Sequence, residues 1–241
     1  MTDIPAPQPL SAYVFELLRR AVLAPVRAFR WQYLPLLMVY YAYGALGIIA
    51  VADSFWVKKE LTLSAAALAH LGVWLTLPWA VKMVFGELVD TVPLLGSRRR
   101  GYVFLGASLI ATGLILLAGA AGGWITFAPP ERLYIIAQIV TVIGVVLQDV
   151  VADAMSTEVV PRKLADGTPR PQADIDHDLG MVQILGRLAL SSGALSVAGL
   201  AGWLADHLPY ETVFLIGLAV PLISASGAML VKLDSSESRP T

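Results

Sequence analysis

The sequence predicts an all-α integral membrane protein with six transmembrane helices. Of its 241 residues, 57% are hydrophobic and 15% are charged, whereas about a quarter of the residues in a typical soluble domain are charged. The mean hydropathy of +0.70 agrees with a membrane protein. Six windows reach the ~20 mostly apolar residues that a helix needs to cross a bilayer. Their polarity does not alternate, as it does in the strands of a membrane barrel, so helices are expected.

The first three spans are expected in the N-terminal half of the chain. Tyr33–Val51 is the first, and Leu63–Val89 is the second, long enough to tilt or to protrude from the bilayer. Gly101–Gly122 is the third. It is bounded by the three consecutive arginines Arg98–Arg100 and by a pair of glycines that ends at Gly123. Residues 31–232 are therefore expected to form one six-helix bundle.

The last three spans are interrupted by one polar segment. Leu133–Met155 is the fourth span, Leu179–Leu204 the fifth and Glu211–Val231 the sixth. Between the fourth and the fifth, residues 156–178 are rich in proline and aspartate and are expected to form a flexible cytoplasmic loop. The polar tail 233–241 is expected to be disordered and cytoplasmic.

The distribution of lysine and arginine predicts the orientation. With the N-terminus inside, the inner segments hold Arg19, Arg20, Arg27, Arg30, Arg98, Arg99, Arg100, Arg162, Lys163, Arg170, Lys232 and Arg239. The outer segments hold only Lys58, Lys59 and Arg132. Because cytoplasmic loops carry an excess of cations, both termini are expected in the cytoplasm. The expected location is the inner (plasma) membrane, which the chain crosses several times.

Residues 1–30 are expected to be a cytoplasmic tail with its own helical segment. Apolar residues recur there at helical spacing, namely Val14, Leu17, Leu18 and Val22. One interpretation is an amphipathic helix that its arginines hold on anionic lipid. The other is a helical extension of the first span that is interrupted at Pro25.

Four ionisable residues lie inside the predicted spans, namely Lys82, Asp149, Asp153 and Arg187. Charges inside a bilayer usually face a partner or a water-filled cavity. We expect Lys82 to pair with Asp149, and an arginine of the 98–100 run to pair with Asp153. The alternative is that these side chains extend to the membrane surface without pairing.

Polar side chains accompany these charges and suggest a binding cavity. The candidate substrate-binding residues are Tyr40, Tyr43, Lys82, Gln148, Asp149, Gln183 and Arg187. Together they would suit a small organic anion with an aromatic ring: Arg187 for a carboxylate, the glutamines for ring edges and the tyrosines for stacking. Each residue alone is more often a contact that joins two membrane helices.

No catalytic, metal-binding or cofactor-binding pattern accompanies the spans. The sequence has no cysteine, no phosphate-binding glycine loop and no metal-ligand spacing among its histidines. The formal net charge is −1, and no nucleic-acid partner is expected. We therefore expect neither an enzyme nor a cofactor.

The stretch Leu77–Tyr102 resembles the folate–biopterin transporter family of the major facilitator superfamily. The matching residues are Pro78, Trp79, Lys82, Gly86, Asp90, Pro93, Gly96, Arg98, Arg99 and Tyr102. The paired aspartates Asp149 and Asp153 are similar to a pair that the family carries in its fourth span. The resemblance implies one half of a major-facilitator-type bundle that transports a folate- or pterin-like anion by alternating access.

The resemblance also implies roles for particular residues. The gating residues would be Gly86, Asp90, Gly96, Arg98, Arg99 and Asp153. Asp149 would be the proton-coupling carboxylate of a symporter. Members of the family have twelve spans and this chain has six, so the expected partner is a second six-helix half from a truncated or split gene, or a second copy in a homodimer. The alternative function is a membrane assembly or scaffold protein related to photosynthetic pigment-complex factors, which share a similar loop.

Overall fold

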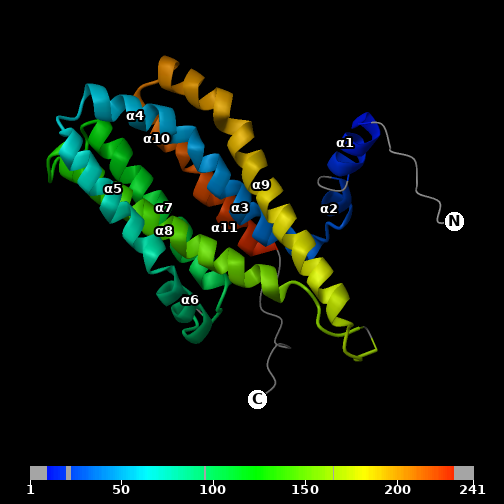
Figure 1. Ribbon diagram of the computed structural model, residues 1–241. Helices are drawn as coiled ribbons and strands as arrows, with labels where there is room; N and C mark the ends of the chain where they lie inside the picture. The colour runs from blue at the N-terminus through cyan, green and yellow to red at the C-terminus, as the bar shows by residue number, and fades with distance from the viewer. Residues whose placement is uncertain (1–9, 20–22, 95, 165, 231–241) are drawn as a thin grey trace.

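The computed structural model describes residues 10–19, 23–94, 96–164 and 166–230, and the regular elements in these ranges are helices. The described chain begins with two short helices, α1 (Leu10–Leu18) and α2 (Ala24–Arg27), which lie to one side of the bundle (Figure 1). Val14 and Leu18 are exposed on α1, and Val22 lies outside the described residues, as does the predicted tail 233–241. The binding of this segment to a lipid surface stays a prediction.

The first span is longer than the sequence predicted. It runs from Trp31 to Lys59. It consists of η2 (Trp31–Tyr33), α3 (Leu34–Ala45), η3 (Leu46–Ile49) and α4 (Ala50–Lys59). The span ends at two lysines, which are the last residues of α4 and are followed by Glu60. The expected end at Val51 is wrong because the polar residues Asp53 and Ser54 continue in the same helix.

The second span is bent. Ser64 caps α5 (Ala65–Ala80), since its hydroxyl accepts a hydrogen bond from the Ala67 amide at 3.1 Å. The helix then turns by 40° into α6 (Lys82–Thr91). Pro78 lies just before the bend, where it removes a backbone donor and disfavours a continuous helix.

The remaining spans extend beyond their predicted ends. They are α7 (Arg100–Ala121), α8 (Pro130–Glu158), α9 (Gln172–His207) and the pair α10 (Tyr210–Gly217) and α11 (Ala219–Leu230). The predicted loop 156–178 is therefore wrong at both ends, and the connection between α8 and α9 covers only residues 159–171. Five spans qualify by length and composition and the bent pair makes a sixth, which confirms the predicted class.

Glycines allow the first span to pack closely on α9. A Cβ atom added at Gly44 would collide with the backbone carbonyl of Leu190, and one at Gly193 would collide with the backbone carbonyl of Tyr41. The two helices therefore approach at backbone distance, in the manner of small-residue contacts between membrane helices.

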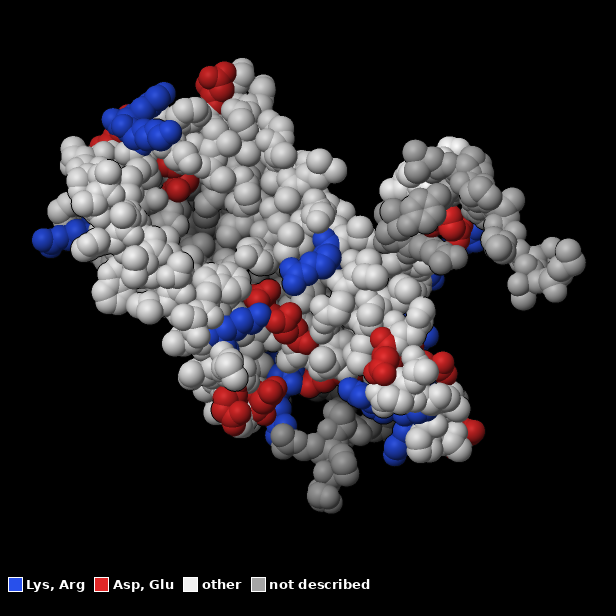
Figure 2. Space-filling model, viewed as in Figure 1, with Lys and Arg blue, Asp and Glu red and all other residues white. Residues whose placement is uncertain are grey.

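The bundle leaves one face less covered than the other. The central windows of α7 and α8 are 56% buried, whereas that of α9 is only 22% buried. In Figure 1, α5 and α6 lie on one side, α9 on the other, and α3 and α4 between them. Figure 2 shows charged side chains at both ends of the bundle and a further group of basic and acidic side chains near the middle of this face.

Candidate functional site

The bend in the second span places Lys82 opposite two carboxylates of α8. Lys82 is the first residue of α6, and its Nζ lies 2.6 Å from Asp149 Oδ2 and 2.6 Å from Asp153 Oδ2. The two aspartates are four residues apart and therefore face the same side of α8. The predicted pairing of Lys82 with Asp149 is confirmed.

Tyr40 joins the first span to the same network. Its hydroxyl donates a hydrogen bond of 2.8 Å to Asp153 Oδ1. The ring is buried and lies where a Cβ at Gly186 of α9 would touch it. Asp153 is thus held by Lys82 and Tyr40. The predicted pairing of Asp153 with an arginine of the 98–100 run is wrong, because Asp153 faces α3 and α6 while those arginines lie beyond the end of α6.

A small cavity lies beside this network. It has a volume of about 10 Å³, which is room for about one water molecule. Tyr40, Tyr43, Gln148 and Asp149 are among its lining residues, and the rest of the wall is apolar. Tyr43 also stacks on Trp79 of α5, with ring centroids 6.2 Å apart. The structure therefore brings four of the seven predicted substrate-binding residues to one pocket.

The two glutamines are engaged in helix contacts. Gln148 is buried, and its side-chain amide donates to the Val103 carbonyl at 3.1 Å and to Ser224 Oγ at 2.8 Å. It therefore joins α8 to α7 and α11. Gln183 of α9 donates to Ser156 Oγ of α8 at 2.8 Å. Both amides connect helices, which is the alternative that the sequence left open.

Arg187 makes no direct hydrogen bond or ion pair with the acidic network in the described part of the chain. Its side chain is exposed on α9. Within the described ranges, none of the hydrogen bonds and ion pairs involves it. The binding of a substrate anion by Arg187 stays a prediction.

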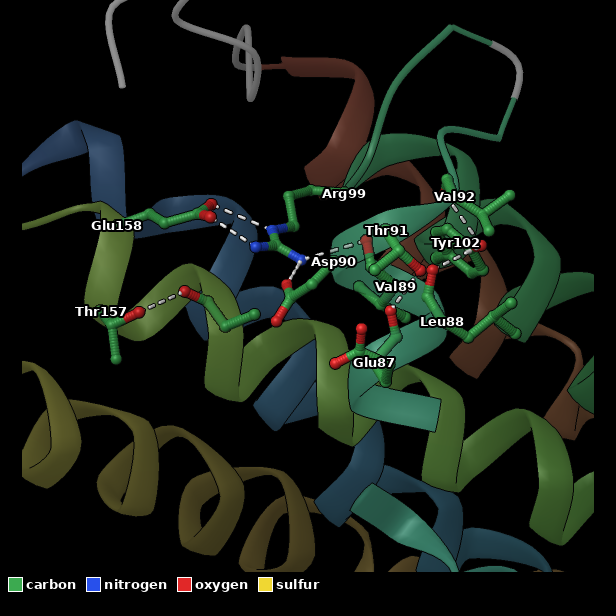
Figure 3. A network of polar contacts seen from close by, with 11 residues as sticks. Glu87, Leu88, Val89, Asp90, Thr91, Val92, Arg99, Tyr102, Thr157 and Glu158 are labelled. Atoms are coloured by element: carbon green, nitrogen blue, oxygen red, sulfur yellow. Dashed lines mark hydrogen bonds and ion pairs between the residues drawn. The ribbon is translucent and has the colours of Figure 1, made fainter. Parts of the chain in front are cut away.

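Arg99 connects the loop after α6 to the end of α8 (Figure 3). Its Nη1 lies 2.7 Å from Asp90 Oδ1. Its Nε and Nη2 donate to the two carboxylate oxygens of Glu158 at 3.0 and 2.5 Å. Burial opposes the charge of the guanidinium, yet the hydrogen bonds to Glu158 and Asp90 raise the pKa of Arg99 above its ordinary value. This two-pronged contact is the strong form of an arginine–carboxylate pair.

Of the other predicted gating residues, Gly86 lies on α6 and Gly96 and Arg98 lie in the loop after it, whereas Asp153 contacts Lys82 and Tyr40. Gly96 has a φ of 77° in the loop, a conformation that glycine adopts without strain. Tyr102 holds the end of α6, because its hydroxyl reaches the carbonyls of Leu88 at 3.2 Å and Val92 at 3.0 Å. Gly86 has open space around it. Arg98 is half-buried, and none of the side-chain contacts given for the described residues involves it.

Two acidic residues that accept side-chain hydrogen bonds, Glu158 and Asp53, were not among the predicted site residues. Glu158 was assigned to a flexible loop, although it follows Asp153 by a little more than one helical turn. Asp53 accepts hydrogen bonds from Gln138 Nε2 at 2.9 Å and from the Tyr134 hydroxyl at 3.4 Å. It was missed because the predicted first span ended at Val51. A helix continued to the lysine pair would have placed Asp53 inside the membrane.

Comparisons with known proteins agree with the resemblance carried by Leu77–Tyr102. A family model described as the BT1 family matches residues 44–241. The folate-biopterin transporter of Synechocystis sp. is 31% identical over 201 residues, which cover 83% of this chain and 37% of that protein. The probable folate-biopterin transporter 4 of Arabidopsis thaliana is 25% identical over 214 residues, which cover 88% of this chain and 40% of that protein.

A third relative matches over a shorter part. The folate transporter 1 of Plasmodium falciparum is 32% identical over 63 residues, which cover 26% of this chain and 12% of that protein. No solved structure matches the chain. The chain spans about two fifths of the length of the first two curated relatives.

Proposed function

Because this chain belongs to the BT1 family, we propose that it forms one six-helix half of a membrane transporter. The substrate class is a folate- or pterin-like organic anion, and the mechanism is alternating access, in which two bundles rock about a site near the middle of the membrane. The transported substrate, the second half and the rocking motion are all part of the proposal.

The observation that carries the proposal is the network of Lys82, Asp149, Asp153 and Tyr40 beside a pocket. It joins α3, α6 and α8 through charged groups inside spans. Such groups are rare in a bilayer and mark substrate or ion pathways. A membrane scaffold needs packing surfaces and has no comparable need for charges at this depth, so the network favours transport.

Arg187 and Tyr43 complete the proposed site. Arg187 offers an uncompensated guanidinium to a substrate carboxylate, and a planar guanidinium binds carboxylates with two parallel hydrogen bonds. Tyr43 and its neighbour Trp79 offer aromatic faces to a ring system. The pocket of one half holds only about a water molecule, so a substrate of this class would occupy a larger space that a second half completes.

Arg99 forms the proposed gate at one end of the bundle. Its contacts to Asp90 and Glu158 tie the loop after α6 to α8. Since a rocking bundle must change its contacts at each end, a charge pair at this position can stabilise one state over the other. Gly86 and Gly96 leave room beside it for a helix of the second half.

The proposed orientation places the Arg99 end in the cytoplasm. The arginines of the 98–100 run and the cations of the connection 159–171 lie at the same end, because Arg99 contacts Glu158 directly. The positive-inside rule then assigns this end to the cytoplasm, with both termini on that side, in the plasma membrane.

Uptake of labelled folate and labelled biopterin tests the transport proposal. The chain is expressed in cells alone, to allow a homodimer, and together with a second six-helix bundle from the same family. Asp149→Asn and Arg187→Ala are expected to abolish uptake at equal membrane abundance, because each removes a charge at the proposed site. Arg162→Ala, which removes an exposed arginine from the connection 159–171, is the matched control and is expected to keep wild-type uptake.

The same experiment decides between transport and the scaffold alternative. If neither arrangement takes up folates, pterins or related anions, the transport proposal fails. A wild-type rate in the Arg187→Ala variant would remove Arg187 from the site and leave the rest of the proposal in place.

A further inference from the structure

Asp53 lies inside the first span, far from the network around Lys82. It is half-buried on α4 and accepts hydrogen bonds from Gln138 Nε2 at 2.9 Å and from the Tyr134 hydroxyl at 3.4 Å. Both donors belong to α8. Gln138 precedes Asp149 by about 16 Å along that helix, at about 1.5 Å per residue. Asp53 is therefore a separate site at the opposite end of the bundle from the Arg99 gate.

The partners of Asp53 are neutral, unlike those of the acids in the predicted site. Asp149 and Asp153 face Lys82, and Asp90 and Glu158 face Arg99. In the ranges that the structure describes, no ion pair involves Asp53. Its negative charge is thus stabilised by two dipoles and by no opposite charge.

The helices around Asp53 bring no cation to it. On its own helix, Lys58 and Lys59 are exposed at the C-terminal end, and Lys59 Nζ lies 5.2 Å from the centroid of the Phe55 ring. On α8, Glu131 accepts a hydrogen bond from Thr62 at 3.0 Å. Arg132, the residue after Glu131 on α8, is exposed, and no ion pair joins it to Asp53 in the described part of the chain.

The other neighbouring helices add no cation either. On α9, the sequence between Arg187 and Asp206 has no titratable residue. Glu211 on α10 and the exposed His70 on α5 make no hydrogen bond or ion pair with Asp53 among the described contacts.

The two donors suit both protonation states of a carboxyl group. The Trp56 ring packs edge-on against Tyr134 at 5.8 Å between centroids, and Trp56 is buried, so the Tyr134 hydroxyl is held toward Asp53. The ionised carboxylate accepts from Gln138 and Tyr134. The protonated group can still accept from Gln138 and can donate its own hydrogen to the Tyr134 oxygen, because a phenol both donates and accepts.

We propose that Asp53 is a proton-binding site of this protein and the proton-coupling carboxylate of the transporter. The coupling part rests on the proposed transport function, whereas proton binding does not. A hydronium ion transfers a proton to the carboxylate: one O–H bond of hydronium breaks as the carboxyl O–H bond forms, and a water molecule is left. The reverse transfer to water releases the proton. This assigns to Asp53 the role that the resemblance gave to Asp149, whose carboxylate lies 2.6 Å from Lys82 Nζ.

Infrared difference spectroscopy of the purified full chain in lipid nanodiscs tests proton binding directly. From neutral to mildly acidic pH, the difference between wild type and Asp53→Asn is expected to lose a carboxylate stretch and to gain the stretch of a protonated carboxyl. The matched difference for Asp166→Asn is expected to keep its carboxylate stretch over the same range, because hydrogen bonds from Thr168 lower the pKa of Asp166. Gln138→Leu removes a donor to the charged form, so the Asp53 transition is expected at a higher pH than in wild type.

Three results would overturn proton binding. An Asp53 band that stays a carboxylate throughout the range is one. A transition that moves when sodium replaces choline in the buffer is the second, because it would indicate a metal cation instead. A transition unaffected by Gln138→Leu is the third. Asp53→Asn preserves the size of the side chain and removes the carboxyl band. If that variant does not fold, Asp53→Glu keeps the carboxyl group, and its band can be compared with that of wild type.

A transport measurement then tests coupling. In proteoliposomes that take up labelled folate, an inward proton gradient is expected to stimulate wild type, and Asp53→Asn is expected to lose this stimulation. Equal stimulation of both would overturn the coupling role. If wild type takes up no substrate at any pH, the transport proposal and the coupling role fail together, while the infrared result still decides whether Asp53 binds a proton.

Discussion

Replacing Lys82 by methionine tests whether burial decides the strength of its two ion pairs. Methionine keeps most of the length of the side chain and removes the charge. The Lys82 side chain is 32% exposed, Asp149 is 13% exposed and Asp153 is 48% exposed. The same nitrogen therefore serves one buried acid and one that water already solvates.

The expected magnitudes follow from this difference. Breaking a buried pair costs about 3–5 kcal/mol because it leaves an uncompensated charge, whereas exposed pairs contribute at most about 1 kcal/mol. Since Lys82 is itself one third exposed, the free energy of unfolding should fall by about 2–4 kcal/mol in Lys82→Met. Most of this loss should come from Asp149.

A double-mutant cycle separates the two pairs. Asp149→Asn and Asp153→Asn are each combined with Lys82→Met, and unfolding is followed by circular dichroism in mixed micelles. We expect a coupling energy of about 2 kcal/mol between Lys82 and Asp149 and less than about 1 kcal/mol between Lys82 and Asp153. Equal couplings, or a larger one to Asp153, would refute the reasoning from burial.

Three further substitutions test the contacts between helices. Arg99→Lys keeps the charge but loses the two-pronged contact to Glu158, so backbone amides of the loop after α6 should exchange faster with deuterium. Gly193→Ala drives a methyl group into the facing backbone of α3 and should cost about 1–3 kcal/mol of stability in micelles, whereas Gly199→Ala, which meets open space, should cost nothing or stabilise slightly. Gln148→Leu removes two buried hydrogen bonds and should cost about 1–3 kcal/mol, seen as a lower Tm in a thermal unfolding scan.

The class and number of the spans could be predicted from the sequence because they depend on local composition. A run of about twenty apolar residues has few options in a bilayer other than a helix. The exact ends were less predictable. α9 begins at Gln172, inside the polar segment that was expected to be a loop. A helix can continue beyond the bilayer, where polarity no longer opposes it.

The pairing of charges was only partly predictable. Lys82 and Asp149 lie at similar predicted depth on different helices, and depth alone paired them correctly. Depth alone gave the wrong partner for Asp153. That choice depends on the bend at Pro78, which turns α6 and brings Lys82 between both carboxylates.

The distinction between an available and an engaged polar group also needed the structure. Gln148 and Arg187 were both candidates for substrate contact. In the structure, Gln148 donates hydrogen bonds to the Val103 carbonyl and to Ser224 Oγ, whereas the Arg187 side chain is exposed. A sequence specifies which atoms can form hydrogen bonds, but not which neighbours stand within reach of them.

The sequence by itself determined that this protein is a helical membrane protein and, through Leu77–Tyr102, which family it belongs to. Hydropathy and motif spacing act along the chain, and both can be read there. Only the tertiary structure decided that Asp153 faces Lys82 and Tyr40, that Arg99 faces Glu158, and that Asp53 faces neutral donors alone. Those facts depend on how separate helices are rotated and bent against one another, and the strength of each charge interaction depends on the burial that this packing creates.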